Sequence, residues 1–135
     1  MQAREHSQEL GAFTPTLDNV RAMTMKTLYD RSLVTEALVG ERLAMSAGAR
    51  HEAHLKRRAA GPPRPVLDEL KTLKTKTLIL WGRNDRGAAL ERALALFQLI
   101  PDAELHTFDR CGHWVQWDQA AGFNRLVADF LAGGS

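Results

Sequence analysis

The chain has 135 residues, of which 44% are hydrophobic and 25% are charged, and these are the proportions of a folded protein with one core. A disordered tail is therefore excluded as the class of protein. The formal net charge of +2 is too small to indicate a nucleic-acid-binding protein, so we expect no nucleic acid partner. The single cysteine, Cys111, excludes an internal disulfide and suits a reducing compartment.

Nothing in the sequence indicates a membrane protein. Residues 1–6 contain no apolar stretch of the kind that secretory signals carry, and no apolar run approaches membrane-spanning length. We therefore expect a cytoplasmic protein without membrane contact. One local basic cluster consists of Lys56, Arg57, Arg58 and Arg64, and we interpret it as the solvated end of a helix.

The chain begins with a segment that has no clear period. Residues 1–13 are polar, so we expect them to form a flexible lead-in. Thr14 and Pro15 then suit the cap and the first position of a helix. The apolar residues that follow recur at loose helical spacing and predict a helix over about 15–29.

Two more helices are predicted before the middle of the chain. Thr35 suits the cap of a helix that ends at the Ser46–Gly48 break, and a third helical piece covers about 51–60. The segment 61–65 contains three prolines in four residues, which can neither continue a helix nor occupy a central strand. We place a boundary there.

The second half of the chain has the pattern of an α/β protein. A short amphipathic helix is predicted over about 66–73, and the continuous apolar run 77–81 predicts a strand buried on both faces. A helical stripe over about 90–97 and a second strand over 103–108 complete a βαβ unit. Asp118 suits the cap of a last helix.

The predicted fold class is α/β, with a helical segment followed by a two-stranded parallel βαβα unit. Two parallel strands do not form a stable open sheet by themselves, because each strand needs neighbours and cover on both faces. We therefore expect other strands to complete this sheet.

Two residues that suit acid–base chemistry follow the two predicted strands. Asp85 lies four residues after Trp81, and His113 lies in the loop after the second strand. Alone, each is more often a turn or structural residue. Because the carboxyl ends of parallel strands meet at one edge of a sheet, we expect the two side chains to converge. A carboxylate there would hold the imidazole in one tautomer and stabilise the imidazolium.

The sequence resembles the α/β-hydrolase family, and more closely the hydrolases that cleave carbon–carbon bonds in meta-cleavage products of aromatic degradation. The residues Leu28–Glu36 are similar to the first part of the lid of these enzymes. The resemblance implies that 14–60 is a helical lid and that 61–135 is a C-terminal segment of the hydrolase core, together a partial α/β-hydrolase fold. The other matching stretches are Thr77–Arg86, Ile100–His106, Cys111–Trp117 and Phe123–Leu131.

The resemblance also implies roles for four residues. Asp85 corresponds to the acid of the catalytic triad and His113 to the general base, while Trp114 lines the site. Arg42 resembles the arginine that holds the carboxylate of a 2-hydroxy-6-oxo-2,4-dienoate substrate, for which a guanidinium fork is well suited. Without the resemblance, Arg42 would be interpreted as a solvent-facing helix residue and Trp114 as a core residue. No cofactor is implied.

The sequence lacks the third member of the triad. No Gly-x-Ser-x-Gly motif, which would present a nucleophilic serine on a strained turn, occurs in the 135 residues. We therefore expect this chain alone to be inactive. Three hypotheses follow: part of a carbon–carbon bond hydrolase completed by another chain, a non-catalytic remnant that self-associates as a homo-oligomer, or an α/β hydrolase of the esterase type.

Other candidates for chemistry are weaker. His51 and His54 are three residues apart, whereas the His-Glu-x-x-His zinc motif needs a spacing of four, so we predict no metal site. Cys111 belongs to the matching motif, and we interpret it as a small buried residue. None of the serines has the sequence context of a nucleophile.

Overall fold

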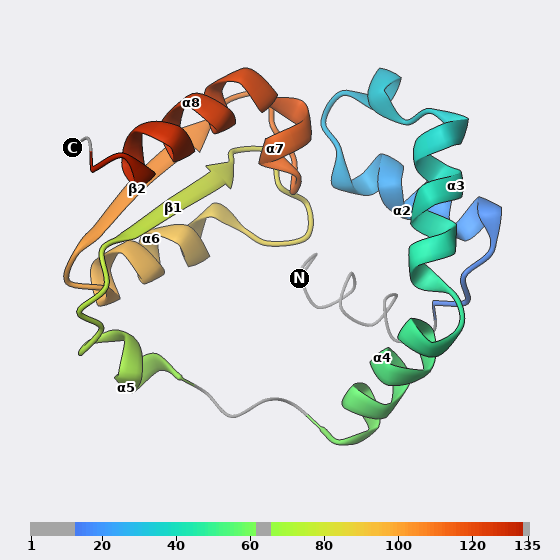
Figure 1. The fold of residues 1–135 in the computed structure, drawn as a ribbon, viewed down its shortest axis with the longest axis horizontal. Helices are drawn as coiled ribbons and strands as arrows, with labels where there is room; N and C mark the ends of the chain where they lie inside the picture. The colour runs from blue at the N-terminus through green and yellow to red at the C-terminus, as the bar shows by residue number, and fades with distance from the viewer. Residues whose placement is uncertain (1–12, 62–65, 134–135) are drawn as a thin grey trace.

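The computed structural model describes residues 13–61 and 66–133. The lead-in predicted for 1–13 therefore lies outside the described residues except for Phe13. The boundary predicted at 61–65 lies outside them except for Gly61. A group of helices occupies one side of the molecule, and two parallel strands with their helices occupy the other (Figure 1). The described elements are α2 (Leu17–Thr27), η2 (Arg31–Leu33), α3 (Glu36–Ser46), α4 (Ala49–Ala59), α5 (Leu67–Leu70), β1 (Thr77–Gly82), α6 (Leu90–Leu99), β2 (Ala103–Phe108), α7 (Val115–Asp118) and α8 (Ala120–Leu131).

The helical segment contains α2, η2, α3 and α4, and the predicted helices are present with small shifts. The predicted cap of the first helix is wrong, because Thr16 rather than Thr14 accepts a hydrogen bond from Asn19 N through its hydroxyl, at 3.3 Å. The carbonyl of Thr14 instead accepts from Thr16 N at 2.9 Å, which forms a turn before the helix. The predicted cap Thr35 is confirmed, since its hydroxyl accepts from Leu38 N at 3.2 Å.

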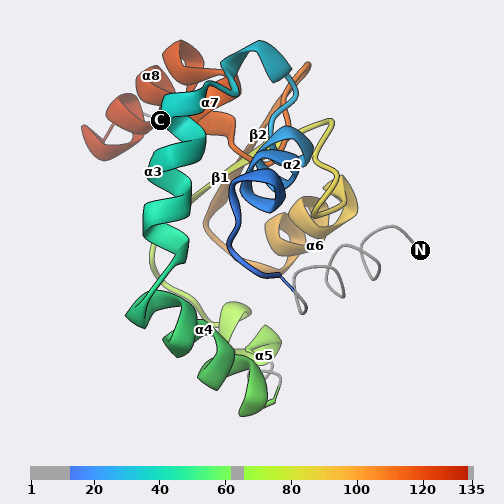
Figure 2. The ribbon, with the colours of Figure 1, turned by 90° about the vertical axis from the view of Figure 1, so that its right-hand side faces the viewer.

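The helices α2 and α3 pack against each other. Val20 on α2 and Val39 on α3 are buried, and burial of such side chains contributes about 1.5–3 kcal/mol each. At the surface of this pair, Arg21 bonds Glu36 at 2.7 Å. The exposed α4 then continues at an angle from α3, as Figure 2 shows.

The α/β unit consists of two parallel strands with a helix on each side. The register runs from Thr77 opposite Ala103 to Gly82 opposite Phe108. The helices α6 and α8 lie on opposite sides of the strands (Figures 1 and 2). Ile79 packs on the α6 side in a core whose other buried members are Ala93 and Ile100.

The strands are less buried than the apolar run predicts. Within β1 only Ile79 and Gly82 are buried, and β2 has exposed residues at His106 and Thr107. The expectation of a strand buried on both faces is therefore wrong for this chain, because the described residues provide one neighbouring strand and a single helix on each side.

The end of the chain also differs from the prediction. Asp118 does not cap the last helix: it ends the short helix α7, and α8 starts after Gln119 without a side-chain cap. The carboxylate of Asp118 has other partners, described below. Among the residues that the structure describes, no helix is long and apolar enough to cross a membrane.

Candidate active site

The loop after β1 fixes the carboxylate of Asp85. This loop turns at once, because Asp85 N donates to Gly82 O at 3.1 Å. One carboxylate oxygen, Oδ1, accepts from Gly87 N at 2.7 Å and from Ala88 N at 3.0 Å. Only 4% of the Asp85 side chain is exposed. The carboxylate is therefore held from behind by backbone amides, and its second oxygen is left for another partner.

That partner is His113, in the loop after β2. Asp85 Oδ2 lies 2.7 Å from His113 Nδ1, so the predicted convergence of the two side chains is present. An ionised carboxylate accepts only, so Nδ1 carries the proton and donates, which leaves Nε2 of the neutral ring free to accept a proton. The His113 side chain is 54% exposed, so a reacting group has access to the ring.

The pair shifts the pKa of both members toward their charged forms. The hydrogen bond to Asp85 raises the pKa of His113, burial opposes this shift, and the charge of Asp85 adds to it. Burial pushes the pKa of Asp85 upward, but the hydrogen bonds from His113, Ala88 and Gly87 outweigh burial, and the pKa is lowered overall. The carboxylate is thus poised to stabilise an imidazolium.

Two glycines allow the loops to approach each other this closely. A Cβ on Gly82 would collide with the backbone carbonyl of Gly112, and one on Gly112 would collide with the backbone carbonyl of Thr27. Any side chain at either position would force backbone apart. The glycines of the Trp-Gly and Cys-Gly-His sequences are therefore explained by steric fit beside the acid and the base.

The His113 loop is also tied to the helical segment. His113 N donates to Thr27 O at 2.8 Å. The carboxylate of Asp118 accepts from Gly112 N at 2.7 Å, from Tyr29 N at 2.9 Å and from Asp30 N at 3.0 Å. Sequence reasoning missed this role of Asp118, because two of its partners lie 88 and 89 residues away and no local pattern indicates them.

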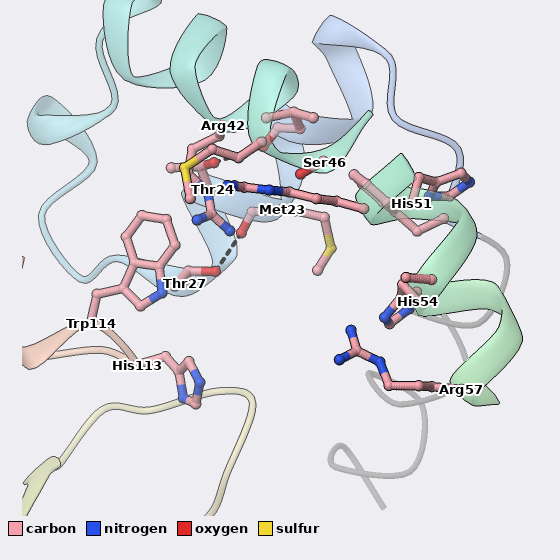
Figure 3. A pocket seen from close by; sticks show the side chains of 15 residues that line it. Met23, Thr24, Thr27, Arg42, Ser46, His51, His54, Arg57, His113 and Trp114 are labelled. Atoms are coloured by element: carbon pink, nitrogen blue, oxygen red, sulfur yellow. Dashed lines mark hydrogen bonds between the residues drawn. The ribbon is translucent and has the colours of Figure 1, made fainter. Parts of the chain in front are cut away.

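Arg42 and Trp114 meet beside the histidine. The guanidinium carbon of Arg42 lies 4.7 Å from the centre of a Trp114 ring, a cation–π distance that orders both side chains. Trp114 in turn contacts Trp117, with ring centres 6.2 Å apart. Arg42 thus points from α3 toward the His113 loop rather than into solvent on the far side (Figure 3).

A cavity of about 680 Å³ opens between the helical segment and the His113 loop, a volume within the usual range of small-molecule sites. Its walls are mixed, with apolar, hydroxyl and cationic side chains. All four sequence-predicted site residues are in or next to it, since Asp85 lies directly behind His113. The lining residues are Phe13, Val20, Met23, Thr24, Thr27, Arg42, Met45, Ser46, Arg50, His51, Ala53, His54, Arg57, His113 and Trp114.

Two other candidates can be assessed. In the described parts of the chain, no group of three or more potential ligands is arranged to hold a metal ion, and His51 and His54 have no third ligand there. Cys111 is fully buried, as predicted. Burial, followed by the charges of Asp118 and Asp85, raises the pKa of its thiol to about 12, which makes it a poor nucleophile.

Comparison with known proteins identifies the family and the fold. Residues 7–120 match the model of the alpha/beta hydrolase fold family. The chain is 42% identical over 126 residues to a 2-hydroxy-6-oxononadienedioate/2-hydroxy-6-oxononatrienedioate hydrolase of Comamonas testosteroni. It is 44% identical over 126 residues to a 2-hydroxy-6-oxo-6-phenylhexa-2,4-dienoate hydrolase of Delftia acidovorans. Each match covers 89% of this chain and 43% of the relative, so the chain spans less than half the length of these relatives.

A solved structure extends the agreement to three dimensions. A meta-cleavage product hydrolase from Pseudomonas fluorescens IP01, complexed with acetates, superposes with a TM-score of 0.82 at 35% sequence identity. The match covers 96% of this chain and 50% of that one. The predicted partial α/β-hydrolase fold is confirmed. The chain belongs to the alpha/beta hydrolase fold family.

Proposed function

We propose that this chain supplies the acid–base part of a hydrolase that cleaves carbon–carbon bonds in 2-hydroxy-6-oxo-2,4-dienoates. The observation that carries the proposal is the 2.7 Å contact between Asp85 and His113 at a cavity that also contains Arg42. The relatives named above support the substrate class, since both are dienoate hydrolases by name.

Each residue has a distinct part in this reaction. Overall, water adds across the bond next to the ketone, which gives a carboxylic acid and a 2-hydroxydienoate. His113 Nε2 accepts and returns the protons that this addition moves, and Asp85 stabilises the imidazolium. Arg42 binds the dienoate carboxylate and offsets negative charge that develops along the conjugated chain. Trp114 orders Arg42 by its ring contact.

The nucleophile in this proposal comes from outside the 135 residues. A serine on a Gly-x-Ser-x-Gly turn, with its oxyanion donors, is supplied by another polypeptide segment that also continues the sheet beside β1. We propose a cytoplasmic location for the assembled enzyme, in keeping with the single cysteine.

The competing function is that of a non-catalytic α/β protein that self-associates. The absence of a Gly-x-Ser-x-Gly motif from the 135 residues favours this alternative. Arg42 beside Trp114 favours a dienoate over an ordinary ester as the substrate.

A chimeric enzyme tests the proposal. The corresponding C-terminal part of the Delftia acidovorans relative is replaced by this chain, and loss of dienoate absorbance is followed. We expect turnover in the chimera, and a fall of about 10²–10⁴-fold on His113→Ala, the range of general acid–base catalysis. The 135-residue chain alone should show no appreciable turnover.

Two outcomes would contradict the proposal. A folded chimera that keeps its turnover after His113→Ala would remove the general-base role. A folded chimera without any turnover, whose parent enzyme is active under the same conditions, would favour the non-catalytic alternative. Arg83→Ala is the matched control, because Arg83 pairs with Asp109 on the surface and does not line the cavity.

A further inference from the structure

The cavity has a second cationic end that the proposed reaction does not use. Arg50, His54 and Arg57 line it from α4, at positions i, i+4 and i+7, and therefore share one face of that helix. Figure 3 shows His54 and Arg57 reaching from α4 into the space opposite His113 and Trp114. Arg42 lies at the His113 end, so positive charge is present at both ends of one cavity.

Within the described residues, no acidic side chain lines the cavity beside these arginines. Among the ion pairs between described residues, none involves Arg42, Arg50 or Arg57. Side chains of one sign that gather in a concave site concentrate the electrostatic potential and attract a ligand of the opposite sign.

Apolar side chains also line the cavity, namely Val20, Met23 and Met45, beside the hydroxyls of Thr24, Thr27 and Ser46. The apolar side chains suit an uncharged carbon chain. A ligand with a negative group at each end and a hydrocarbon middle therefore matches the charged and apolar parts of this lining. A ligand with an aromatic ring at its far end would cover Arg50 and Arg57 without giving them an acceptor, which costs desolvation energy.

We propose that the α4 face formed by Arg50, His54 and Arg57 is a subsite for a second carboxylate, so that the preferred substrate is a dienedioate rather than an aryl dienoate. This inference rests on the proposed function and narrows its substrate class. Arg42 binds the carboxylate next to the enol, and the α4 face binds the carboxylate beyond the ketone. The α4 face thus determines specificity and takes no part in the bond cleavage.

Binding to the 135-residue chain tests the subsite by calorimetry. The probes are 2-hydroxy-6-oxononadienedioate, with two carboxylates, and 2-hydroxy-6-oxo-6-phenylhexa-2,4-dienoate, with one. We expect the dioate to bind about tenfold more tightly, the scale of one charge-assisted contact that solvent partly screens. Arg50→Gln with Arg57→Gln should remove this preference, because the dioate loses its second charged contact while the phenyl compound no longer covers two unpaired charges and binds no more weakly than before.

Two further variants separate the subsite from the proposed function. Arg42→Gln should weaken the binding of both probes, because both carry the dienoate carboxylate. Arg92→Gln is the matched control, since Arg92 is exposed on α6 outside the cavity, and it should change neither. Circular dichroism of each variant checks that the fold is kept.

Each remaining outcome is decisive. If both probes bind equally, or if Arg92→Gln acts like the α4 variant, the subsite is wrong, and an Arg42→Gln effect would still support the proposed function. If binding of the dioate depends on the α4 residues but not on Arg42, the subsite stands and the proposed dienoate site fails. If neither probe binds, both are overturned.

Discussion

At the scale of residues, the decisive feature is how the environment divides the roles of Asp85 and His113. Asp85 is almost fully covered and holds three hydrogen bonds, whereas the His113 ring is about half exposed. The carboxylate therefore cannot itself accept a proton from a ligand in the cavity. The imidazole, which the carboxylate polarises from behind, is the group that faces it.

This arrangement predicts a pH dependence of stability. The pKa of His113 is raised in the folded chain above its ordinary value of 6.5. The protonated ring therefore stabilises the fold fully below that value, and the contribution is lost as the pH rises through the folded pKa. The pKa of Asp85 is lowered, so its carboxylate stays ionised throughout this window.

Urea unfolding of wild type and His113→Gln measures the effect. The difference in the free energy of unfolding between the two should be larger near about pH 5.5 than near about pH 9. The remaining histidines are common to both proteins and cancel in the difference. In an Asp85→Asn background the pH dependence of the difference should shrink strongly. A difference that stays constant with pH would show that the ring does not titrate against Asp85.

At the scale of elements, Asp118 joins parts of the chain that are far apart in sequence. Its carboxylate accepts from Gly112, which precedes His113, and from Tyr29 and Asp30, which follow α2. The base-bearing loop and the first turn after α2 thus share one acceptor. The position of the helical segment over the cavity depends on this contact and on the bond from His113 N to Thr27 O.

Asp118→Asn should therefore destabilise the chain by about 1–3 kcal/mol, since the amide removes the charge and one of the two acceptor oxygens. Urea unfolding measures the loss, and amide hydrogen exchange at Tyr29 and Gly112 should accelerate. Asp109→Asn is the matched control, because Asp109 forms an exposed pair with Arg83, and it should cost less than about 1 kcal/mol. Equal effects of the two substitutions would disprove the connecting role of Asp118.

The sequence predicts those features whose signal is local. The strands are marked by apolar runs, and Asp85 and His113 follow their ends, so the convergence of the pair follows from parallel topology. Asp118 was assigned to a helix cap because its type and position suit one. Its real partners are amides of a distant turn, which no periodicity encodes. The sequence pattern likewise places Arg57 in a solvated basic cluster, whereas it lines the cavity, because a helical pattern does not show what lies opposite a helix.

At the scale of the whole molecule, the amount of exposed surface is the main feature. The accessible surface is 9468 Å², whereas a compact monomer of 15.0 kDa would expose about 7,000 Å². Large apolar side chains contribute to it, among them Leu94 and Phe97 on α6 and Leu131 at the end of α8. In the described residues the sheet has only two strands, so each strand has an edge without a partner.

We therefore expect the 135-residue chain to associate in solution, most simply as a homodimer. Association covers apolar surface and gains about 25 cal/mol of free energy per Å² covered. It also gives hydrogen-bond partners to the backbone groups at the strand edges. Sedimentation equilibrium over a range of concentrations should give a mass near twice 15.0 kDa. Adding the N-terminal part of the Delftia acidovorans relative as a separate chain should compete with self-association, because it would continue the sheet at the same edge of β1. A well-folded monomer at the highest soluble concentration would contradict the expectation, since the exposed edges and apolar surface would then be stable in water without a partner.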